Sequence, residues 1–335
     1  MVFVPDAAFP TALAVAPDGR VFFAERSGAI KVVDAGGVRT LDTVPTATAE
    51  SGGGYNERGL LGLALSPTFS TDHLVYVYWS RPDYTTQVVE RFRECNGAAG
   101  AREAIITLPA GDGCCHKGGR IAFGPDGKLY VTVGDQHAVA PGEVANPDSV
   151  PQNPADLRGK ILRYEPDGSV PGDNPFGAGS AVWAAGFRNP YGLAFGNGTA
   201  FVTDNGPTGD LGWDRGMDLA MVVPAGARFQ WPACAGYSHP TPGATDCVGG
   251  IEPDWSSEEG TVVPTGAAWI DESGPAPLAG HFVFCTLNDG MLIFTPGDPH
   301  ATVVPGPSEC KLDVAQGPDH AVYYSDEQAV YRFAP

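Results

Sequence analysis

The residues best suited to chemistry lie in the stretch CCHKGGRIAFGPDGKLYVTVGDQ, which begins at Cys114. His116 precedes one apolar run, Asp135 ends the next, and the turn-forming residues Pro-Asp-Gly lie between the runs at 125–127. Because a β-hairpin brings its two ends together, we expect His116 and Asp135 to be neighbours at one rim of a sheet. An imidazole oriented by a carboxylate can accept a hydroxyl proton near neutral pH, which predicts a general base. The alternative is a structural histidine.

Two further motifs place polar groups at the starts of predicted strands. Arg188 and Asn189 lie in GFRNPYGLAF, where the guanidinium could form a bidentate contact with a ligand carboxylate or a quinone oxygen. A surface salt bridge is the alternative for Arg188. Glu57 precedes RGLLG at the corresponding corner of another unit, and it either faces a central cavity or is a turn carboxylate.

The motif DNGP, residues 204–207, ends a predicted strand and offers calcium ligands. The backbone carbonyls of Gly206 and Pro207 are hard oxygen donors of the kind that Ca²⁺ prefers. Asp210, Asp214 and Asp218 follow and could hold a second Ca²⁺, although their spacing is not that of an EF-hand loop. The alternative is a solvated acidic loop.

The composition indicates many short strands joined by tight turns. The 335 residues include 45 glycines and 31 prolines, and 43% of them are apolar, which argues against disorder. Helical periodicity is absent from the sequence. The net charge of −19 argues against a nucleic-acid partner, because such a partner needs a basic face.

An apolar strand, a turn and a second apolar strand recur along the chain. The pattern predicts an all-β fold, a six-bladed β-propeller with four-stranded antiparallel blades, that forms a single domain over residues 1–335. A pair of β-sandwiches is the alternative. The six repeated units span residues 12–34, 59–80, 119–135, 192–207, 266–294 and 312–333.

The seven cysteines favour an oxidising compartment, and we therefore expect a periplasmic or secreted protein. Possible pairs are Cys234 with Cys247, Cys285 with Cys310, and either Cys114 with Cys115 or one of these two with Cys95; the odd count leaves at least one thiol unpaired. Buried reduced thiols are the alternative. The first ten residues, MVFVPDAAFP, lack the regions of a signal peptide, so we expect none in this sequence. No run of about 20 apolar residues predicts a membrane span.

Several common catalytic motifs are missing from the sequence. There is no GxGxxG between a strand and a helix, no Walker A motif, no HExxH and no GxSxG. Nucleotide-binding, zinc-protease and nucleophile-elbow functions are therefore not indicated.

The chain resembles the soluble quinoprotein glucose/sorbosone dehydrogenases, including bacterial aldose sugar dehydrogenases. The matching phrases run in the family's order: FPTALAVAPDGRVFFAERSGAIKVV, ERGLLGLALSPTF, HKGGRIAFGPDGKLYVTVGDQ, ADLRGKILRYEPDGSVPGDNPF, GFRNPYGLAF, DNGP and LDVAQGPD. The resemblance implies a six-bladed propeller with pyrroloquinoline quinone (PQQ) over its axis, held by Ca²⁺. It also implies that a histidine takes the proton of a sugar's anomeric hydroxyl while hydride passes to the quinone, which gives a lactone.

The resemblance also implies roles for individual residues. His116 is the base and Asp135 its partner. The cofactor contacts are Glu57, Arg188, Asn189, Thr261 and Lys311; the carbonyl ligands of the cofactor's Ca²⁺ are Gly206 and Pro207; Asp218 lies beside a second Ca²⁺.

The segment CKLDV departs from the family pattern RxRDV. Cys310 and Leu312 stand where the family has two arginines that contact the cofactor's carboxylates. Lys311, on the alternate side of the strand, is the cation that remains there. Asn288 replaces a lysine found in some relatives, and Cys115 replaces an Asn or Asp before the histidine.

Three functions remain open from the sequence. The first is a PQQ-dependent dehydrogenase of aldose sugars, with an electron acceptor that the sequence does not specify. The second is a family member with changed cofactor binding that binds a saccharide or a protein partner without redox chemistry. The third is a Ca²⁺-dependent lactonase that uses His116.

Overall fold

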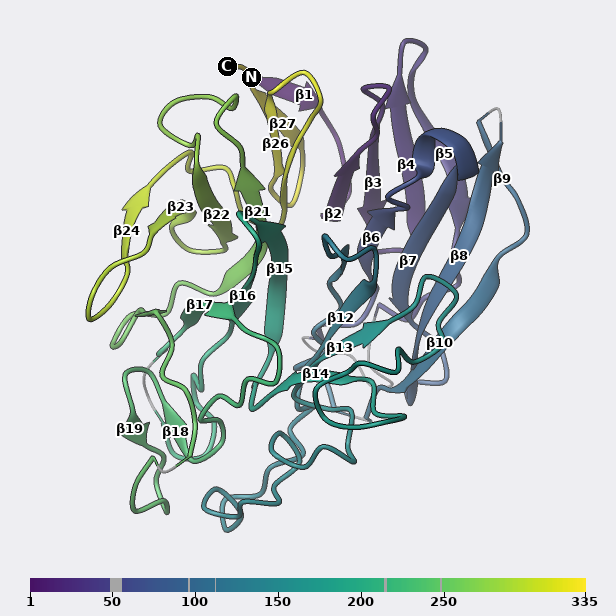
Figure 1. Ribbon diagram of the computed structural model, residues 1–335. Helices are drawn as coiled ribbons and strands as arrows, with labels where there is room; N and C mark the ends of the chain where they lie inside the picture. The colour runs from purple at the N-terminus through teal and green to yellow at the C-terminus, as the bar shows by residue number, and fades with distance from the viewer. Residues whose placement is uncertain (49–55, 96, 112, 214–215, 248) are drawn as a thin grey trace.

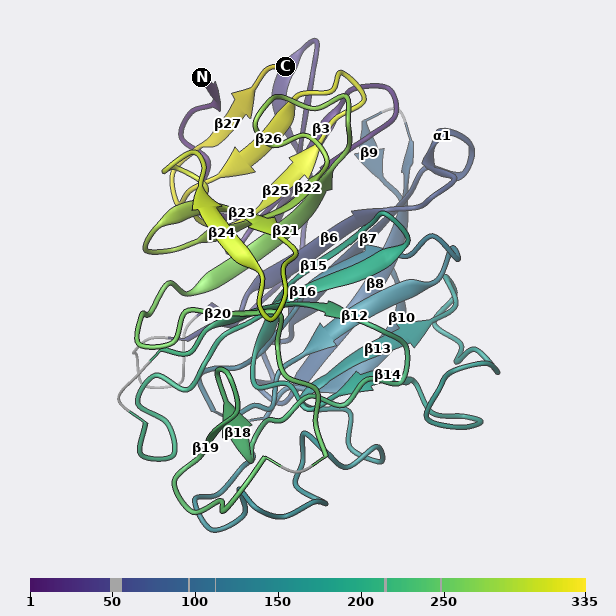
Figure 2. The same cartoon turned by 60° about the vertical axis from the view of Figure 1, so that its left-hand side comes forward.

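A computed structural model describes the whole chain except residues 49–55, 96, 112, 214–215 and 248. Six antiparallel sheets are arranged around a central axis, and each has four main strands (Figures 1 and 2). The prediction of an all-β, six-bladed propeller is confirmed. Each repeated unit of the sequence supplies the inner strands of one blade.

The first three blades follow the chain from the inside of the ring outward. Blade 1 consists of β2 (Pro10–Val15), β3 (Val21–Glu25), β4 (Ala29–Asp34) and β5 (Gly37–Thr43). Blade 2 consists of β6 (Leu60–Leu65), β7 (Leu74–Ser80), β8 (Thr86–Cys95) and β10 (Glu103–Pro109), and β9 (Ala98–Ala99) pairs with β8. Blade 3 consists of β11 (Ile121–Phe123), β12 (Leu129–Val133), β13 (Lys160–Tyr164) and β14 (Val182–Ala185).

The last three blades complete the ring. Blade 4 consists of β15 (Pro190–Gly196), β16 (Thr199–Asp204), β17 (Leu219–Val223) and β20 (Trp255–Ser256). Blade 5 consists of β21 (Pro264–Ile270), β22 (His281–Thr286), β23 (Gly290–Thr295) and β24 (Thr302–Pro305). Blade 6 consists of β25 (Val314–Gln316), β26 (Val322–Ser325), β27 (Val330–Phe333) and β1 (Val2–Val4).

The N-terminal strand closes the ring. β1 pairs with β27, so that Val2 lies opposite Tyr331 and Val4 opposite Val330, and the two chain ends lie side by side (Figure 1). The innermost strands contact one another in sequence, and β25 contacts β2. Each innermost strand of the described blades therefore has an innermost strand on both sides, while β1 completes blade 6 at its outer edge.

Apolar side chains on the blade faces hold neighbouring blades together. Leu61 and Tyr76 of blade 2, for example, share a buried cluster with Ile121 and Val131 of blade 3. Each such side chain contributes about 1.5–3 kcal/mol when it is fully buried. A single blade would expose these faces to water, which explains why the repeats are stable only as a ring.

The described chain contains one short helix, α1 (Phe69–Asp72), and none of the helices described is long or apolar enough to cross a membrane. The two longest loops follow β12 and β17, and the second contains the short hairpin β18 (Cys234–Ala235) and β19 (His239–Pro240). Both loops extend to the lower end of the molecule in Figure 1.

Three disulfides fix loops near the ring. They join Cys234 to Cys247, Cys285 to Cys310, and the adjacent residues Cys114 and Cys115. The first two were expected as pairs, and the vicinal alternative holds for the third. Cys95 remains an exposed thiol. The Cys114–Cys115 pair directly precedes His116 in the chain.

Candidate active site

His116 and Asp135 meet where the hairpin β11–β12 starts and ends. The two side chains are buried, and Nδ1 of His116 lies 2.6 Å from Oδ1 of Asp135. The approach depends on Gly134, because a Cβ there would lie 2.2 Å from the carbonyl oxygen of His116. His116 itself has a φ of 55°, a left-handed conformation that only a small share of non-glycine residues adopt.

Asp135 is held on its other side by a residue from a distant loop. Nε1 of Trp231 donates a hydrogen bond of 2.8 Å to Oδ2 of Asp135. Burial by itself would raise the pKa of Asp135, but His116, Arg188 and Trp231 outweigh burial and hold this pKa below its ordinary value. An ionised Asp135 accepts a hydrogen bond from the N–H at Nδ1 of His116, which leaves a lone pair on Nε2 that can accept a proton.

Asp210 faces the Nε2 side of the imidazole. Its Oδ2 lies 3.5 Å from Nε2 of His116 and accepts hydrogen bonds from Nε and Nη2 of Arg188. The ring of His137 stacks on that of His116 with centroids 3.8 Å apart. The two predicted groups, imidazole and guanidinium, therefore converge on one carboxylate. Burial is the main cause that lowers the pKa of His137, and the charge of the neighbouring His116 is the second.

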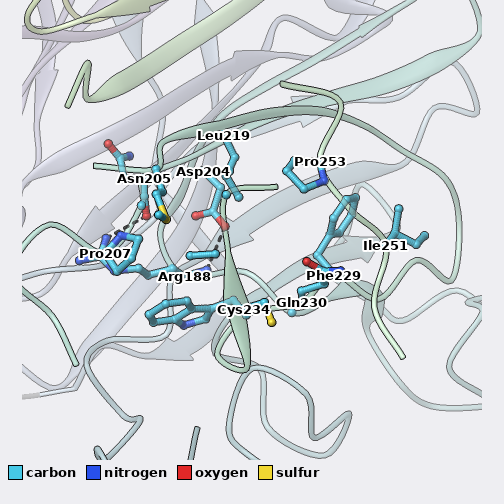
Figure 3. A pocket seen from close by; sticks show the side chains of 16 residues that line it. Arg188, Asp204, Asn205, Pro207, Leu219, Phe229, Gln230, Cys234, Ile251 and Pro253 are labelled. Carbon is cyan, nitrogen blue, oxygen red and sulfur yellow. Dashed lines mark hydrogen bonds between the residues drawn. The ribbon is translucent and has the colours of Figure 1, made fainter. Parts of the chain in front are cut away.

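The start of β15 is positioned by Asp204, the last residue of β16. Its carboxylate accepts hydrogen bonds from the backbone N–H groups of Arg188 (3.0 Å) and Asn189 (2.6 Å). Burial raises the pKa of Asp204 to about 7. Figure 3 shows Arg188 beside Asp204, Asn205 and Pro207, and its Nη1 donates to the carbonyl of Asn205 at 2.9 Å.

A cavity of about 270 Å³ opens at the propeller axis beside this cluster. Glu57 and Asn189 line it, and Oε2 of Glu57 accepts a hydrogen bond of 3.2 Å from Nδ2 of Asn189. Oδ1 of Asn189 in turn accepts the N–H of Gly118, two residues after His116. Asn189 therefore links Glu57 in the cavity wall to the backbone just after His116 through two hydrogen bonds.

Three predicted cofactor contacts, Arg188, Thr261 and Lys311, are not among the residues that line the cavity. The carbonyl of Thr261 accepts a hydrogen bond from Asn288, and Nζ of Lys311 donates one of 3.2 Å to the carbonyl of Asn288 at an exposed rim. Thr265, four residues after Thr261, lines the cavity instead, and its hydroxyl donates to the carbonyl of Lys311. Leu312 lines the cavity as well.

Asp218 shapes the turn that carries the predicted calcium ligands. Its carboxylate accepts backbone N–H groups from Gly206 (2.8 Å), Val262 (2.8 Å) and Val263 (2.9 Å), and burial raises its pKa. Gly206 has no room for a side chain, since a Cβ would lie 1.9 Å from the carbonyl of Gly216. Asp218 therefore fixes the backbone of this turn through hydrogen bonds.

The carbonyls of Gly206 and Pro207 accept backbone hydrogen bonds of 2.9 Å and 3.4 Å within the turn that follows. Each carbonyl oxygen has a second lone pair for a cation. Asp210 binds Arg188, and the carboxylate predicted at position 214 lies outside the described residues.

A family model described as glucose/sorbosone dehydrogenase matches residues 7–332. The chain belongs to the glucose/sorbosone dehydrogenase family. Quinoprotein glucose dehydrogenase B of Acinetobacter calcoaceticus is 32% identical over 253 residues, which cover 68% of this chain and 51% of that protein. The chain thus spans about half the length of this curated relative.

Two solved structures are similar to this chain over almost its whole length. A glucose dehydrogenase-like oxidoreductase from Thermus thermophilus is 29% identical with a TM-score of 0.78, covering 96% of this chain and 92% of that one. The PQQ-bound aldose sugar dehydrogenase of Streptomyces coelicolor is 26% identical with a TM-score of 0.75, covering 99% and 96%.

Three residues of the site were not predicted from the sequence: Trp231, His137 and Thr265. Trp231 lies 96 residues from its partner Asp135, and no local pattern marks it. His137 follows Asp135 by two residues, so its closeness in sequence was an available signal. Thr265 is the second threonine of the TVVPTG motif, but the motif alone does not show which of its two threonines faces the cavity.

Proposed function

We propose that this chain is a PQQ-dependent aldose dehydrogenase that oxidises the anomeric carbon of aldoses to lactones. The observation that carries the proposal is the His116–Asp135 pair, which is buried and hydrogen-bonded, lines a cavity of about 100 Å³ and is linked through Gly118 and Asn189 to the axial cavity of about 270 Å³. Family membership and the likeness to a PQQ-bound aldose sugar dehydrogenase support it.

Polar side chains lie at the edge of the axial cavity, and in this structure their donors bind groups of the protein. The amides of Asn189 and Asn205 and the hydroxyl of Thr265 border it, together with apolar wall residues and the guanidinium-bearing Arg26. Its size is close to the lower end of small-molecule sites, which begin at about 300 Å³. Polar edges around an apolar wall are the surroundings that a heterocycle with carbonyl and carboxylate oxygens requires.

The chain departs from the family at the two arginine positions. Cys310 is buried in its disulfide with Cys285, and Leu312 presents an apolar side chain to the cavity. PQQ is a tricarboxylate, so these replacements remove charge-assisted hydrogen bonds and weaken its binding. Arg26 is a cation in the same cavity lining as Leu312, and Lys311 precedes Leu312 in the chain.

Glu57, Asn189 and Arg188 would contact the cofactor, and the carbonyls of Gly206 and Pro207 would bind its Ca²⁺. When bound, PQQ supplies the two-electron acceptor for hydride, and Ca²⁺ polarises it as a Lewis acid. Asp218 keeps Gly206 in place through the backbone hydrogen bond described above.

His116 performs the proton transfer in this proposal. Its Nε2 accepts the proton of the anomeric hydroxyl, and Asp135 stabilises the imidazolium that forms. Trp231 keeps the Asp135 carboxylate aimed at Nδ1. Oδ2 of Asp210 lies 3.5 Å from Nε2 of His116. In this proposal, the sugar hydroxyl displaces this carboxylate when it binds to Nε2.

Reconstitution tests the proposal. The purified chain is loaded with PQQ and Ca²⁺, and dye reduction is measured with glucose and other aldoses. We expect turnover, and we expect His116→Ala to lower kcat by about 10²–10⁴. His239→Ala, at a partly exposed histidine paired with Glu258, is the matched control and keeps full activity. Tight PQQ binding without sugar oxidation would refute the proposal.

A second candidate function is supported by the apolar Leu312 and the disulfide-bonded Cys310. A propeller with weakened cofactor binding could bind a saccharide without redox chemistry. In the same experiment, this candidate predicts sugar binding by calorimetry with no PQQ bound at micromolar cofactor. Lactone hydrolysis with Ca²⁺ alone would instead indicate the lactonase alternative.

The three disulfides also support a location outside the cytoplasm, in the periplasm or secreted. Expression of the chain with an export signal in an oxidising compartment, followed by counting free thiols, tests this location. One free thiol, that of Cys95, is expected.

A further inference from the structure

Three potential metal ligands converge at the open side of His116. Oδ2 of Asp210 lies 3.5 Å from Nε2 of His116, and Oδ1 of Asp210 lies 3.9 Å from Nδ1 of His137. One ligand atom from each residue lies within 4.8 Å of the other two. The three residues come from separate loops, before β11, after β12 and after β16, and they border a cavity of about 100 Å³.

The donor set selects the kind of ion. Two imidazoles and one carboxylate suit Zn²⁺ and similar transition-metal ions, whereas Ca²⁺ requires oxygen ligands. Zn–N distances of about 2.0–2.1 Å place tetrahedral ligands about 3.3 Å apart. The ligand atoms, which lie within 4.8 Å of one another, therefore need to close by up to about 1.5 Å. His137 can make that movement, because its side chain is 40% exposed and its ring can tilt out of the stack.

The neighbours of the cluster already orient it for a metal. Asp135 binds Nδ1 of His116, and Trp231 binds Asp135, which is the outer arrangement that fixes metal-ligating histidines in other proteins. Arg188 donates a hydrogen bond to Oδ2 of Asp210, whereas Oδ1 of Asp210 faces His137. A carboxylate can thus join the guanidinium with one oxygen and an ion with the other.

We propose that His116, His137 and Asp210 form a binding site for a divalent transition-metal ion such as Zn²⁺, and that this ion blocks the base. The blocking effect rests on the proposed function; the binding does not. Nε2 of His116 cannot hold a metal ion and accept a hydroxyl proton at the same time. The site is separate in its ligands from the carbonyl oxygens proposed for Ca²⁺.

A competing set shares His137 with Cys114 and Cys115. These cysteines are joined in a disulfide, and a disulfide lacks the thiolates that bind metal. Metal binding through these cysteines requires prior reduction of the disulfide. Binding without reductant therefore distinguishes the site at His116, His137 and Asp210 from the cysteine set.

Binding is measured first, without cofactor or sugar. The full chain, free of chelator and reductant, is titrated with Zn²⁺ by calorimetry and with Co²⁺ by visible absorption. We expect one ion per chain, with a Co²⁺ spectrum of nitrogen and oxygen ligands. His137→Ala and Asp210→Asn should each weaken binding at least ten-fold, and the control His239→Ala should leave it unchanged. Binding that His137→Ala leaves intact, or that appears only after reduction, overturns the site.

Inhibition is measured separately on the PQQ- and Ca²⁺-loaded enzyme. Zn²⁺ should inhibit sugar oxidation, and its inhibition constant should rise at least ten-fold in His137→Ala but not in His239→Ala. Inhibition that is equally strong in His137→Ala overturns the blocking role. If the loaded chain oxidises no sugar, the proposed function fails, while the Co²⁺ titration still decides whether the site exists.

Discussion

Arg120 and Asp313 form a buried ion pair between blades 3 and 6, which lie opposite each other across the propeller axis. Nη1 of Arg120 is 3.0 Å from Oδ2 of Asp313, and both side chains are about 5% exposed. Asp313 also accepts the backbone N–H of Leu13 from blade 1 at 2.7 Å. Within the described residues, Nε and Nη2 of Arg120 have no hydrogen-bond partner. The pair therefore joins three blades at the centre of the ring.

Breaking this pair should destabilise the fold strongly. Arg120→Met leaves the Asp313 carboxylate buried and uncompensated, and we expect a loss of about 3–5 kcal/mol in the free energy of unfolding. Urea denaturation of wild type and variant measures it. Arg332→Met, which removes a partly exposed pair with Asp319, is the control and should cost less than about 1 kcal/mol. Similar losses in the two variants would contradict the prediction.

Trp231→Phe tests how the base is positioned. The substitution keeps an aromatic ring but removes the donor to Oδ2 of Asp135. We expect kcat to fall about ten-fold while KM for the sugar changes little, because the indole acts through Asp135 and not on the substrate.

Steady-state kinetics of the PQQ-loaded enzyme checks the Trp231 prediction. Trp183→Phe, at a buried tryptophan between blades 3 and 4, is the matched control and should keep kcat within about two-fold. An equal rise in KM and fall in kcat for Trp231→Phe would point to general disruption of the site.

Leu312→Arg should restore tighter binding of PQQ. The side chain at this position lines the axial cavity, and a guanidinium there can form charge-assisted hydrogen bonds of about 1.5–3 kcal/mol. The dissociation constant for PQQ, measured by fluorescence titration with Ca²⁺ present, should fall at least ten-fold. Leu287→Met, another change in the same lining, is the control. Unchanged affinity in Leu312→Arg would place the cofactor elsewhere.

Lys160 should make stability depend on pH above neutrality. Burial lowers the pKa of Lys160 to about 7, against an ordinary 10.5. Between these values the unfolded chain holds the proton that the folded chain has lost, so Lys160 contributes a stability that rises with pH, by at most about 1.4 kcal/mol per unit. Below pH 7, the free-energy cost of burying the charged ammonium of Lys160 is fully present.

Denaturation at pH 7, 8 and 9 measures the Lys160 effect as a difference in slope between wild type and Lys160→Met. Lys128→Met removes a partly exposed lysine paired with Glu165 and should leave the slope unchanged. Equal slopes for Lys160→Met and wild type would mean that the carbonyls of Val150, Pro151 and Arg158, which accept from Nζ, keep the ammonium charged.

The fold could be predicted because its signal is local and repeated. Each unit carries two apolar runs around a turn, and each run became an inner strand of one blade, as at 119–135, where β11 and β12 pair across the Pro-Asp-Gly turn. The pairing of β1 with β27 lacked such a signal, since a three-residue strand at one end of the chain finds its partner more than 300 residues away.

The sequence by itself determined the six blades and the closeness of His116 to Asp135, because a hairpin fixes the distance between its own ends. Only the tertiary structure decided that Trp231 binds Asp135 and that Asp210 lies between Arg188 and Nε2 of His116. Loops of the neighbouring blades 3 and 4 meet at that point, and their meeting depends on how these two blades pack against each other. Short-range patterns in the sequence predict the strands, whereas the surroundings of the base come from the packing of blades that are distant in sequence.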